Sequence, residues 1–177
     1  EAKVPLVSTV GSQAVVEPQD AIKRWAFKTT QNDDLIAEAL IAHMARAKVK
    51  RLGYIGFNDP FGEGFLKILP AMLAKYKIEL VATEKYSRTD QSVTGQTLKL
   101  IAAKPDAVFI AAVGGPAVLP QATLRDQGFK GTVYQTHAIA TQDFIKIGGA
   151  KVEGTVLAAG GMLVFDEMAD ANPVKSV

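Results

Sequence analysis

Cysteine is absent from the 177 residues of this chain. Its absence excludes disulfide bonds, thiolate chemistry and metal sites that use cysteine ligands. Histidine is scarce as well, because only His43 and His137 occur, and they lie too far apart in the sequence to match a metal-binding motif. We therefore expect no metal site in this protein.

Long apolar runs and blocks of like charge are also missing. No apolar run approaches the ~18–20 residues that a membrane-spanning helix requires. The 20 basic and 18 acidic residues give a net charge of +2, and the basic residues are scattered along the chain. Scattered basic residues do not indicate a nucleic-acid-binding surface, so we expect no nucleic-acid partner.

The motifs of common enzyme classes are missing too. No GxGxxG follows the first strand, and neither GxxxxGKS, GxxxxGKT nor GxSxG occurs. Nothing in the sequence combines a nucleophile, a base and an oxyanion site. We predict that the protein is not an enzyme and that it uses no cofactor.

What the sequence does contain is a regular alternation of short apolar runs and helical patterns. Strand-like runs begin near Arg51, Ile78, Ala107, Thr132 and Thr155, and helical patterns cover residues 61–76, 94–103, 116–127 and 141–147. Such alternation predicts an α/β fold, a doubly wound parallel sheet with helices on both faces. Extended segments near residues 4–8 and 25–29 and a helix over residues 33–47 precede this region.

The predicted fold is organised around the stretch KPDAVFIAAVGGP, from Lys104 to Pro116. An apolar run is followed by two glycines, a proline and then a helical pattern. The pattern predicts a strand that is buried on both faces and that ends in a glycine-rich turn opening a helix. In open α/β sheets, ligands bind at such junctions, outside the carboxyl ends of the strands.

Three predicted strand ends carry residues suited to binding. They are Phe61 in the loop NDPFGEG, Val113 and Gly114 in the loop after the next buried strand, and His137 in the loop QTHA. Each loop also has a purely structural interpretation: a helix cap with an inward-packed Phe61, a tight turn chosen for sterics, and a polar loop. In the same way, the three aspartates nearest the predicted helix starts are interpreted as caps and turn residues, namely Asp33, Asp34 and Asp59.

At this level of detail the chain resembles the leucine/isoleucine/valine-binding protein family, the type I periplasmic solute-binding proteins of ABC transporters. The residues that carry the resemblance are PLVS at 5–8, FGEG at 61–64, KPDAVFIAAVGG at 104–115 and GGAKVEG at 148–154. They occur in the order and spacing of the family over nearly the whole chain.

The resemblance implies a division of the chain, because such proteins have two lobes joined by three crossings. Residues 1–29 are expected to be the end of lobe I and the first hinge crossing, residues 30–159 to be lobe II, and residues 160–177 to be the return crossing toward lobe I. The start at Glu1, without methionine or a visible signal peptide, is interpreted as a processed or trimmed end of a longer protein.

The resemblance also implies a ligand site. Ser8, Gly11 and Ser12 match the lobe I strand end that holds a ligand carboxylate. Phe61 matches an aromatic residue, usually tyrosine, that covers the ligand from lobe II. Two further positions depart from the family pattern, since Val113, next to Gly114, replaces a frequent tyrosine and His137 replaces an acidic residue that pairs with the ligand ammonium.

The second departure predicts the ligand class. An ammonium group that is closed into a cleft without an anionic partner costs several kcal/mol. Neutral histidine supplies no charge, and protonated histidine repels the ammonium group. His137 therefore favours an organic acid, aromatic or aliphatic, over a branched-chain or other hydrophobic amino acid.

The expected function is solute capture for an ABC importer, with a small-molecule ligand and the transporter permease as partners. The expected location is the periplasm, or the cell exterior with a membrane tether. Two alternatives remain open: a ligand-sensing effector or receptor domain of the same fold, and a flavodoxin-like or Rossmann-like enzyme. We also expect the chain itself to associate through its terminal segments, because Val4–Ser8 would lack the sheet that normally covers it.

Overall fold

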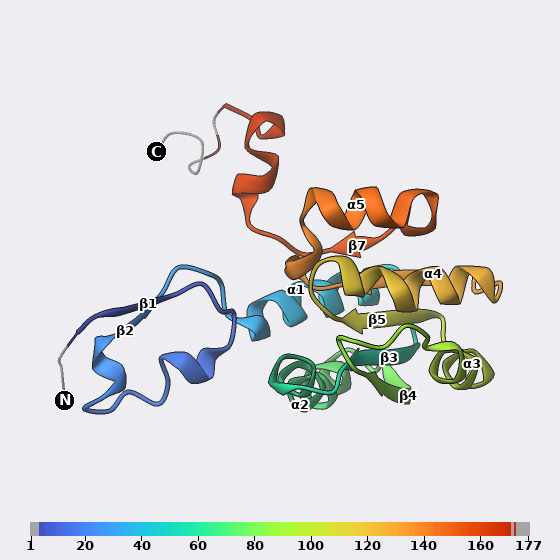
Figure 1. Cartoon of the computed structure of the whole chain (residues 1–177), viewed down its shortest axis with the longest axis horizontal. Helices are drawn as coiled ribbons and strands as arrows, with labels where there is room; N and C mark the ends of the chain where they lie inside the picture. Colours follow the sequence, from blue (N-terminus) through green and yellow to red (C-terminus); the bar gives the residue numbers. More distant parts are fainter. Residues whose placement is uncertain (1–3, 171, 173–177) are drawn as a thin grey trace.

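The structure, a computed structural model, describes residues 4–170 and residue 172 and shows two parts (Figure 1). In the smaller part, β1 (Leu6–Ser8) pairs in parallel with β2 (Ala26–Lys28), and the short 3-10 helices η1 (Gln13–Val15) and η2 (Lys23–Trp25) lie between them. We call residues 4–29 the N-terminal segment. The predictions for the two chain ends also include residues 1–3, 171 and 173–177, which lie outside the described residues.

The larger part is built on a five-stranded sheet in which every pairing is parallel. Its strands are β3 (Arg51–Phe57), β4 (Glu79–Tyr86), β5 (Ala107–Ala111), β6 (Thr132–Gln135) and β7 (Val156–Leu157), in the order β4-β3-β5-β6-β7. Each strand begins within one residue of its predicted start. The predicted α/β parallel sheet is therefore confirmed, and we call this part, from α1 to β7, the five-stranded unit.

Five α-helices connect and cover the strands. They are α1 (Asp33–Arg46), α2 (Pro60–Lys75), α3 (Thr94–Ala102), α4 (Val118–Asp126) and α5 (Gln142–Gly148), with 3-10 helices η3 (Gly115–Ala117), η4 (His137–Ile139), η5 (Gly149–Val152) and η6 (Gly161–Glu167). One core cluster joins α1 and α2 to the sheet, and a second joins α3, α4 and α5 to its other face, so the sheet is doubly wound. None of the described helices is long and apolar enough to cross a membrane.

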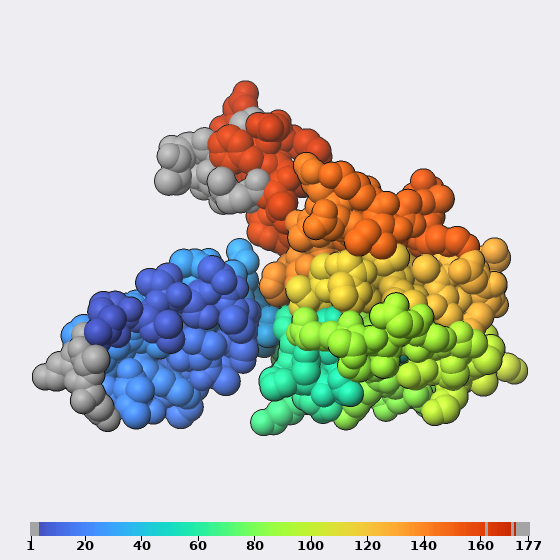
Figure 2. Space-filling view, viewed as in Figure 1, coloured from blue at the N-terminus to red at the C-terminus, as the bar shows by residue number. Residues whose placement is uncertain are grey.

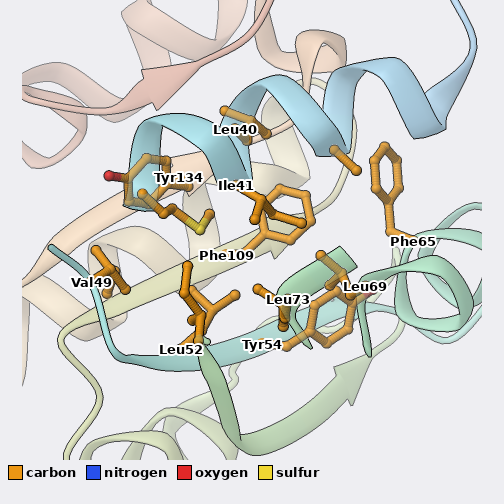
Figure 3. Close-up of a cluster of buried hydrophobic side chains, with 14 of the residues drawn as sticks. Leu40, Ile41, Val49, Leu52, Tyr54, Phe65, Leu69, Leu73, Phe109 and Tyr134 are labelled. Atoms are coloured by element: carbon orange, nitrogen blue, oxygen red, sulfur yellow. The ribbon is translucent and has the colours of Figure 1, made fainter. Parts of the chain in front are cut away.

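The packing of the sheet explains why the central strands appear in the sequence as continuous apolar runs. Every residue of β5 is buried, because helices pack on both faces of the sheet. On the α1 and α2 side, Phe109 of β5 makes edge-to-face contacts with Tyr54 of β3 and Phe65 of α2, at ring-centroid distances of 6.0 and 5.6 Å (Figure 3). These aromatic rings fix α2 against the middle of the sheet.

The two parallel strands of the N-terminal segment bury little of their apolar surface. Val7 of β1 is 64% exposed and Phe27 of β2 is 52% exposed, and Val4, Leu6 and Ile22 are more exposed than Phe27. A two-stranded sheet is marginal by itself, and exposed apolar strands pair readily with other chains. This surface supports the expectation that the chain associates with itself.

We therefore expect the 177-residue chain to form dimers or larger assemblies at micromolar concentration. Because Val7 lies on the exposed strand, Val7→Lys should shift the population toward monomer. The matched control is Leu98→Lys, which adds the same charge at an exposed leucine on α3 and should leave the assembly unchanged. Light scattering coupled to gel filtration measures the mass, and a monomeric wild-type chain contradicts the expectation.

Candidate functional site

The sheet order places a topological switch point between β3 and β5. The chain leaves β3 for β4 on one side, and then crosses to β5 and β6 on the other side. Ligands of doubly wound folds bind where the loops at the carboxyl ends of such strands diverge. In this structure those carboxyl ends face the N-terminal segment (Figure 1). The predicted site residues of the five-stranded unit follow these strand ends, with Phe61 in the first turn of α2, Val113 and Gly114 after β5, and His137 in η4.

The loop after β3 is fixed by the cap of α2. Asp59 Oδ1 accepts hydrogen bonds from the backbone N–H groups of Phe61 (2.9 Å) and Gly62 (3.2 Å), and Arg88 Nε donates to Asp59 Oδ2 (2.6 Å). Burial raises the pKa of Asp59, but these hydrogen bonds outweigh burial and lower it overall. The predicted cap is confirmed. Phe61 is half-buried and packs edge-on against Phe65, so its ring partly belongs to the core.

The loops after β5 and β6 are bonded to each other. Gly114 has a positive φ of 59°, which a side chain disfavours, and its N–H donates to the carbonyl of Ala138 (3.1 Å). Thr136 is fully buried, and its hydroxyl donates to the carbonyl of Ala112 (3.1 Å) while accepting from the N–H of Ala138. The structure thus brings the loop of Val113 and Gly114 beside that of His137.

Of the three predicted residues in the N-terminal segment, Gly11 is hydrogen-bonded to the five-stranded unit. Its carbonyl accepts from Lys28 Nζ (2.6 Å) and from the N–H of Asp33 (3.2 Å), and Gly11 is buried. Ser8 Oγ accepts from the N–H of Val10 (3.2 Å), and Ser12 makes no side-chain capping bond to η1. Figure 2 shows the segment and the five-stranded unit as two bodies joined near the start of α1.

The carboxylate of Asp33 also lies at this junction, and it is not among the site residues predicted from the sequence. It was interpreted as a helix cap, but Asn32 holds the N-cap position and α1 has no side-chain capping bond, so that prediction is wrong. Asp33 Oδ1 is instead buried without a hydrogen-bond partner. Burial raises the pKa of Asp33, whereas the charges of His137 and Lys28 act in the opposite direction.

His137 carries a matching feature. Its Nδ1 is also buried without a hydrogen-bond partner. Burial lowers the pKa of His137, and the negative charge of Asp33 opposes that shift. The predicted ligand class assumes that no anion acts on His137, and this premise is corrected, because the charge of Asp33 acts on the imidazole. The preference for an organic acid stays a prediction.

A groove in the described residues lies elsewhere. Its volume is about 650 Å³, and it runs between η4, α5, β7 and η6, where Ile139, Phe144, Leu157 and Leu163 line it. It contains none of the seven predicted site residues. The strand-end site is better suited to a polar solute, because the groove has few polar groups to orient one. Among the described residues, no cluster of three or more metal-ligating side chains occurs.

Comparisons with known proteins agree with this arrangement. The family model described as periplasmic binding protein matches residues 1–173. An extracellular ligand-binding receptor from Rhodopseudomonas palustris HaA2 is 47% identical, with a TM-score of 0.92 over 99% of this chain and 48% of that one. A second Rhodopseudomonas palustris receptor is 34% identical, with a TM-score of 0.86 over 96% of this chain and 46% of that one.

A more distant structure shares the fold. It is a branched-chain amino acid ABC transporter protein from Thermus thermophilus with bound valine, 18% identical, with a TM-score of 0.79 over 86% of this chain and 40% of that one. No match was found among curated protein sequences. The chain spans about half the length of the solved structures that it resembles.

Proposed function

Because this chain belongs to the periplasmic binding protein family, we propose that it forms part of the solute-binding component of an ABC importer. The family consists of solute-binding proteins rather than enzymes. In this proposal residues 1–29 end lobe I and make the first crossing, residues 30–159 form lobe II, and residues 160–177 return toward lobe I. The two lobes close on the solute, and the closed form engages the permease in the periplasm or at the cell exterior.

The observation that best supports this proposal is the convergence of two surfaces at the switch point. The loops after β3, β5 and β6 face the N-terminal segment, and Gly11 contacts the start of α1. A cleft between two bodies at the carboxyl edge of a parallel sheet is where a small solute binds in folds of this type. Capture by hinge closure requires this geometry and no catalytic group.

The proposed solute is a small organic acid, aromatic or aliphatic, or a branched-chain or other hydrophobic amino acid. Ser8, Gly11 and Ser12 hold its carboxylate with backbone and hydroxyl groups. Phe61 covers it from the opposite side, where the loop of Val113 and Gly114 and the imidazole of His137 complete the site. These contacts follow the family pattern at matched positions, and the half-buried ring of Phe61 leaves one part of its surface free for a ligand.

The ligand class is tested with His137→Glu in the complete gene product that contains this chain. We expect the wild type to bind aromatic or aliphatic acids at least about tenfold more tightly than leucine or valine, and His137→Glu to shift the preference toward the amino acids because it supplies an anion. Gln91→Glu is the control, since it adds the same charge at an exposed loop residue. Calorimetry measures the affinities. Micromolar binding of leucine, with no binding of the organic acids, refutes the preference for organic acids.

Transport and sensing are separated in cells. Deletion of the gene should abolish uptake of the bound solute if the protein serves an importer. Unchanged uptake, together with a lost transcriptional or signalling response to the solute, favours the sensor alternative instead. Failure of every acid and amino acid to bind contradicts solute capture itself.

A further inference from the structure

We propose that the end of the five-stranded unit at which the strands begin holds the protein at an anionic phospholipid surface. We call this end the basic edge. It comprises the five segments that lead into the strands, namely residues 46–51, 75–79, 104–106, 125–131 and 151–155. The proposal goes beyond solute capture, because the basic edge lies opposite the strand ends that face the N-terminal segment (Figure 1).

The basic edge carries half of the basic residues of the chain. Its five segments contain ten basic and four acidic residues, a net charge of +6, whereas the rest of the chain contains ten basic and fourteen acidic residues, a net charge of −4. All strands of a parallel sheet begin at the same edge, so cations that are scattered from Arg46 to Lys151 in the sequence come to lie at one end of the fold. The fold therefore creates a charged surface that the sequence does not show.

Hydrogen bonds hold the segments of the basic edge beside one another. The carboxylate of Asp106 accepts from the N–H groups of Lys50 (2.8 Å) and Arg51 (2.9 Å). The guanidinium group of Arg51 donates to the carbonyl of Lys104 (3.1 Å) and pairs with the carboxylate of Glu79 (3.1 Å). The segments before β3, β4 and β5 thus form one surface, and two of its four acidic residues are bonded within it.

Most cations of the basic edge are exposed without an anionic partner. Arg51 and Lys151 make ion pairs, and Arg125 is half-buried with its guanidinium group bonded to the carbonyls of Phe129 and Gly131. The other seven cations are exposed, and none of them makes an ion pair within residues 4–170 and 172. These seven are Arg46, Lys48, Lys50, Lys75, Lys77, Lys104 and Lys130. Their like charges repel one another, and an anionic surface relieves this repulsion.

Three of these lysines adopt a backbone conformation that glycine adopts more easily. Lys48, Lys77 and Lys104 have φ angles of 62°, 55° and 51°, each two residues beyond the end of a helix, as Gly128 is beyond α4. The helix dipole favours a cation at such an end, but α1, α2 and α3 already have basic residues in their last turns. The three lysines therefore add surface charge at a cost in backbone strain, which points to a function outside the fold.

The chemistry of the seven cations fits a broad, fluid anionic surface rather than one bound anion. Six are lysines, whose ammonium groups are point charges on flexible stems, whereas arginine supplies the planar fork that binds a single phosphate in two places. The groove described above contains none of them. Clusters of about four to eight basic residues are attracted to anionic lipids, within a Debye length of about 8 Å at physiological ionic strength.

The basic edge has nothing to insert into a membrane. None of the large apolar side chains that are exposed lies in its five segments. Binding that depends on charge alone is reversible and is weakened by salt. We therefore expect the basic edge to keep the protein near a membrane without anchoring it.

Vesicles of defined composition test the proposal on the complete gene product. At about 50 mM salt, we expect at least about tenfold tighter binding to vesicles with equal parts of phosphatidylglycerol and phosphatidylcholine than to pure phosphatidylcholine vesicles, and little difference at about 500 mM salt. Co-sedimentation measures the bound fraction. Equal binding to the two kinds of vesicle at low salt, or binding to neither, overturns the proposal. Tighter binding to double-stranded DNA than to the anionic vesicles also overturns it, because the basic edge would then fit a nucleic acid.

A combined variant assigns the binding to the basic edge. The triple variant Lys48→Gly, Lys77→Gly and Lys104→Gly should bind anionic vesicles at least about tenfold more weakly than the wild type. Because glycine relieves the backbone strain at these positions, the variant should unfold at the wild-type temperature or above it. Circular dichroism on heating measures this temperature. Unchanged vesicle binding in this variant overturns the proposal.

The matched control removes the same charge elsewhere. The triple variant Lys67→Gln, Lys85→Gln and Lys146→Gln neutralises three exposed lysines outside the basic edge and should keep wild-type vesicle binding. An equal loss of binding in this control shows that net charge alone governs the attraction, and it too overturns the proposal.

Discussion

Replacing Gly62 with alanine should destabilise the protein by about 3 kcal/mol, a large part of the stability of a domain. Gly62 is buried in the first turn of α2, where a Cβ atom would overlap the carbonyl oxygen of Phe57 and lie 2.7 Å from its nitrogen. Both atoms belong to the backbone of β3, a strand paired on both sides, so they cannot move aside. The change also disturbs the hydrogen bond from Tyr54 Oη to the carbonyl of Gly62 (2.7 Å).

Gly64 provides the matched control in the same helix. A Cβ atom there meets nothing within 4 Å, and the residue is exposed. Because alanine is the better helix former, Gly64→Ala should stabilise the protein by about 0.5–1 kcal/mol. Urea unfolding followed by circular dichroism measures both variants. A Gly62→Ala protein as stable as the wild type would show that α2 is not seated on β3 as described.

The second large effect concerns binding by the 177-residue chain alone. We expect its affinity for the solute to be at least about 100-fold weaker than that of the complete gene product, a difference of about 2.7 kcal/mol. A solute that is closed between two lobes takes contacts from both, and this chain spans about half the length of its solved relatives. The exposed side of the solute stays in water, where its polar contacts contribute little.

Calorimetry on the two proteins under the same conditions measures this difference. The Val7→Lys variant of the chain should be included, because self-association through β1 and β2 can cover part of the cleft. Equal affinity in the short chain and the complete protein contradicts the two-lobe proposal, since it places every important contact within residues 1–177. Weak binding in the short chain with tight binding in the complete protein agrees with it.

The sequence by itself determined the sheet and its edge. Strands buried on both faces show as continuous apolar runs, and the runs at Arg51, Ala107 and Thr132 begin where the structure places β3, β5 and β6. Because parallel strands end at one edge, the loops of Phe61, Val113 and His137 were predictable as neighbours without coordinates. The helix cap at Asp59 was also predictable from the sequence, because the N–H groups that it accepts lie only two and three residues further along the chain.

Only the tertiary structure decided the chemistry of the junction. Asp33 sits among cap-like residues in the sequence, and nothing local distinguishes a carboxylate that caps a helix from one that points at another segment. Gly11 covers the Asp33 carboxylate only because the N-terminal segment packs against the start of α1. The effect of Asp33 on His137 likewise depends on where the end of β6 lies relative to the start of α1. Burial of an ionisable group and the charges around it are sums over residues distant in sequence, so they arise only once the chain has folded.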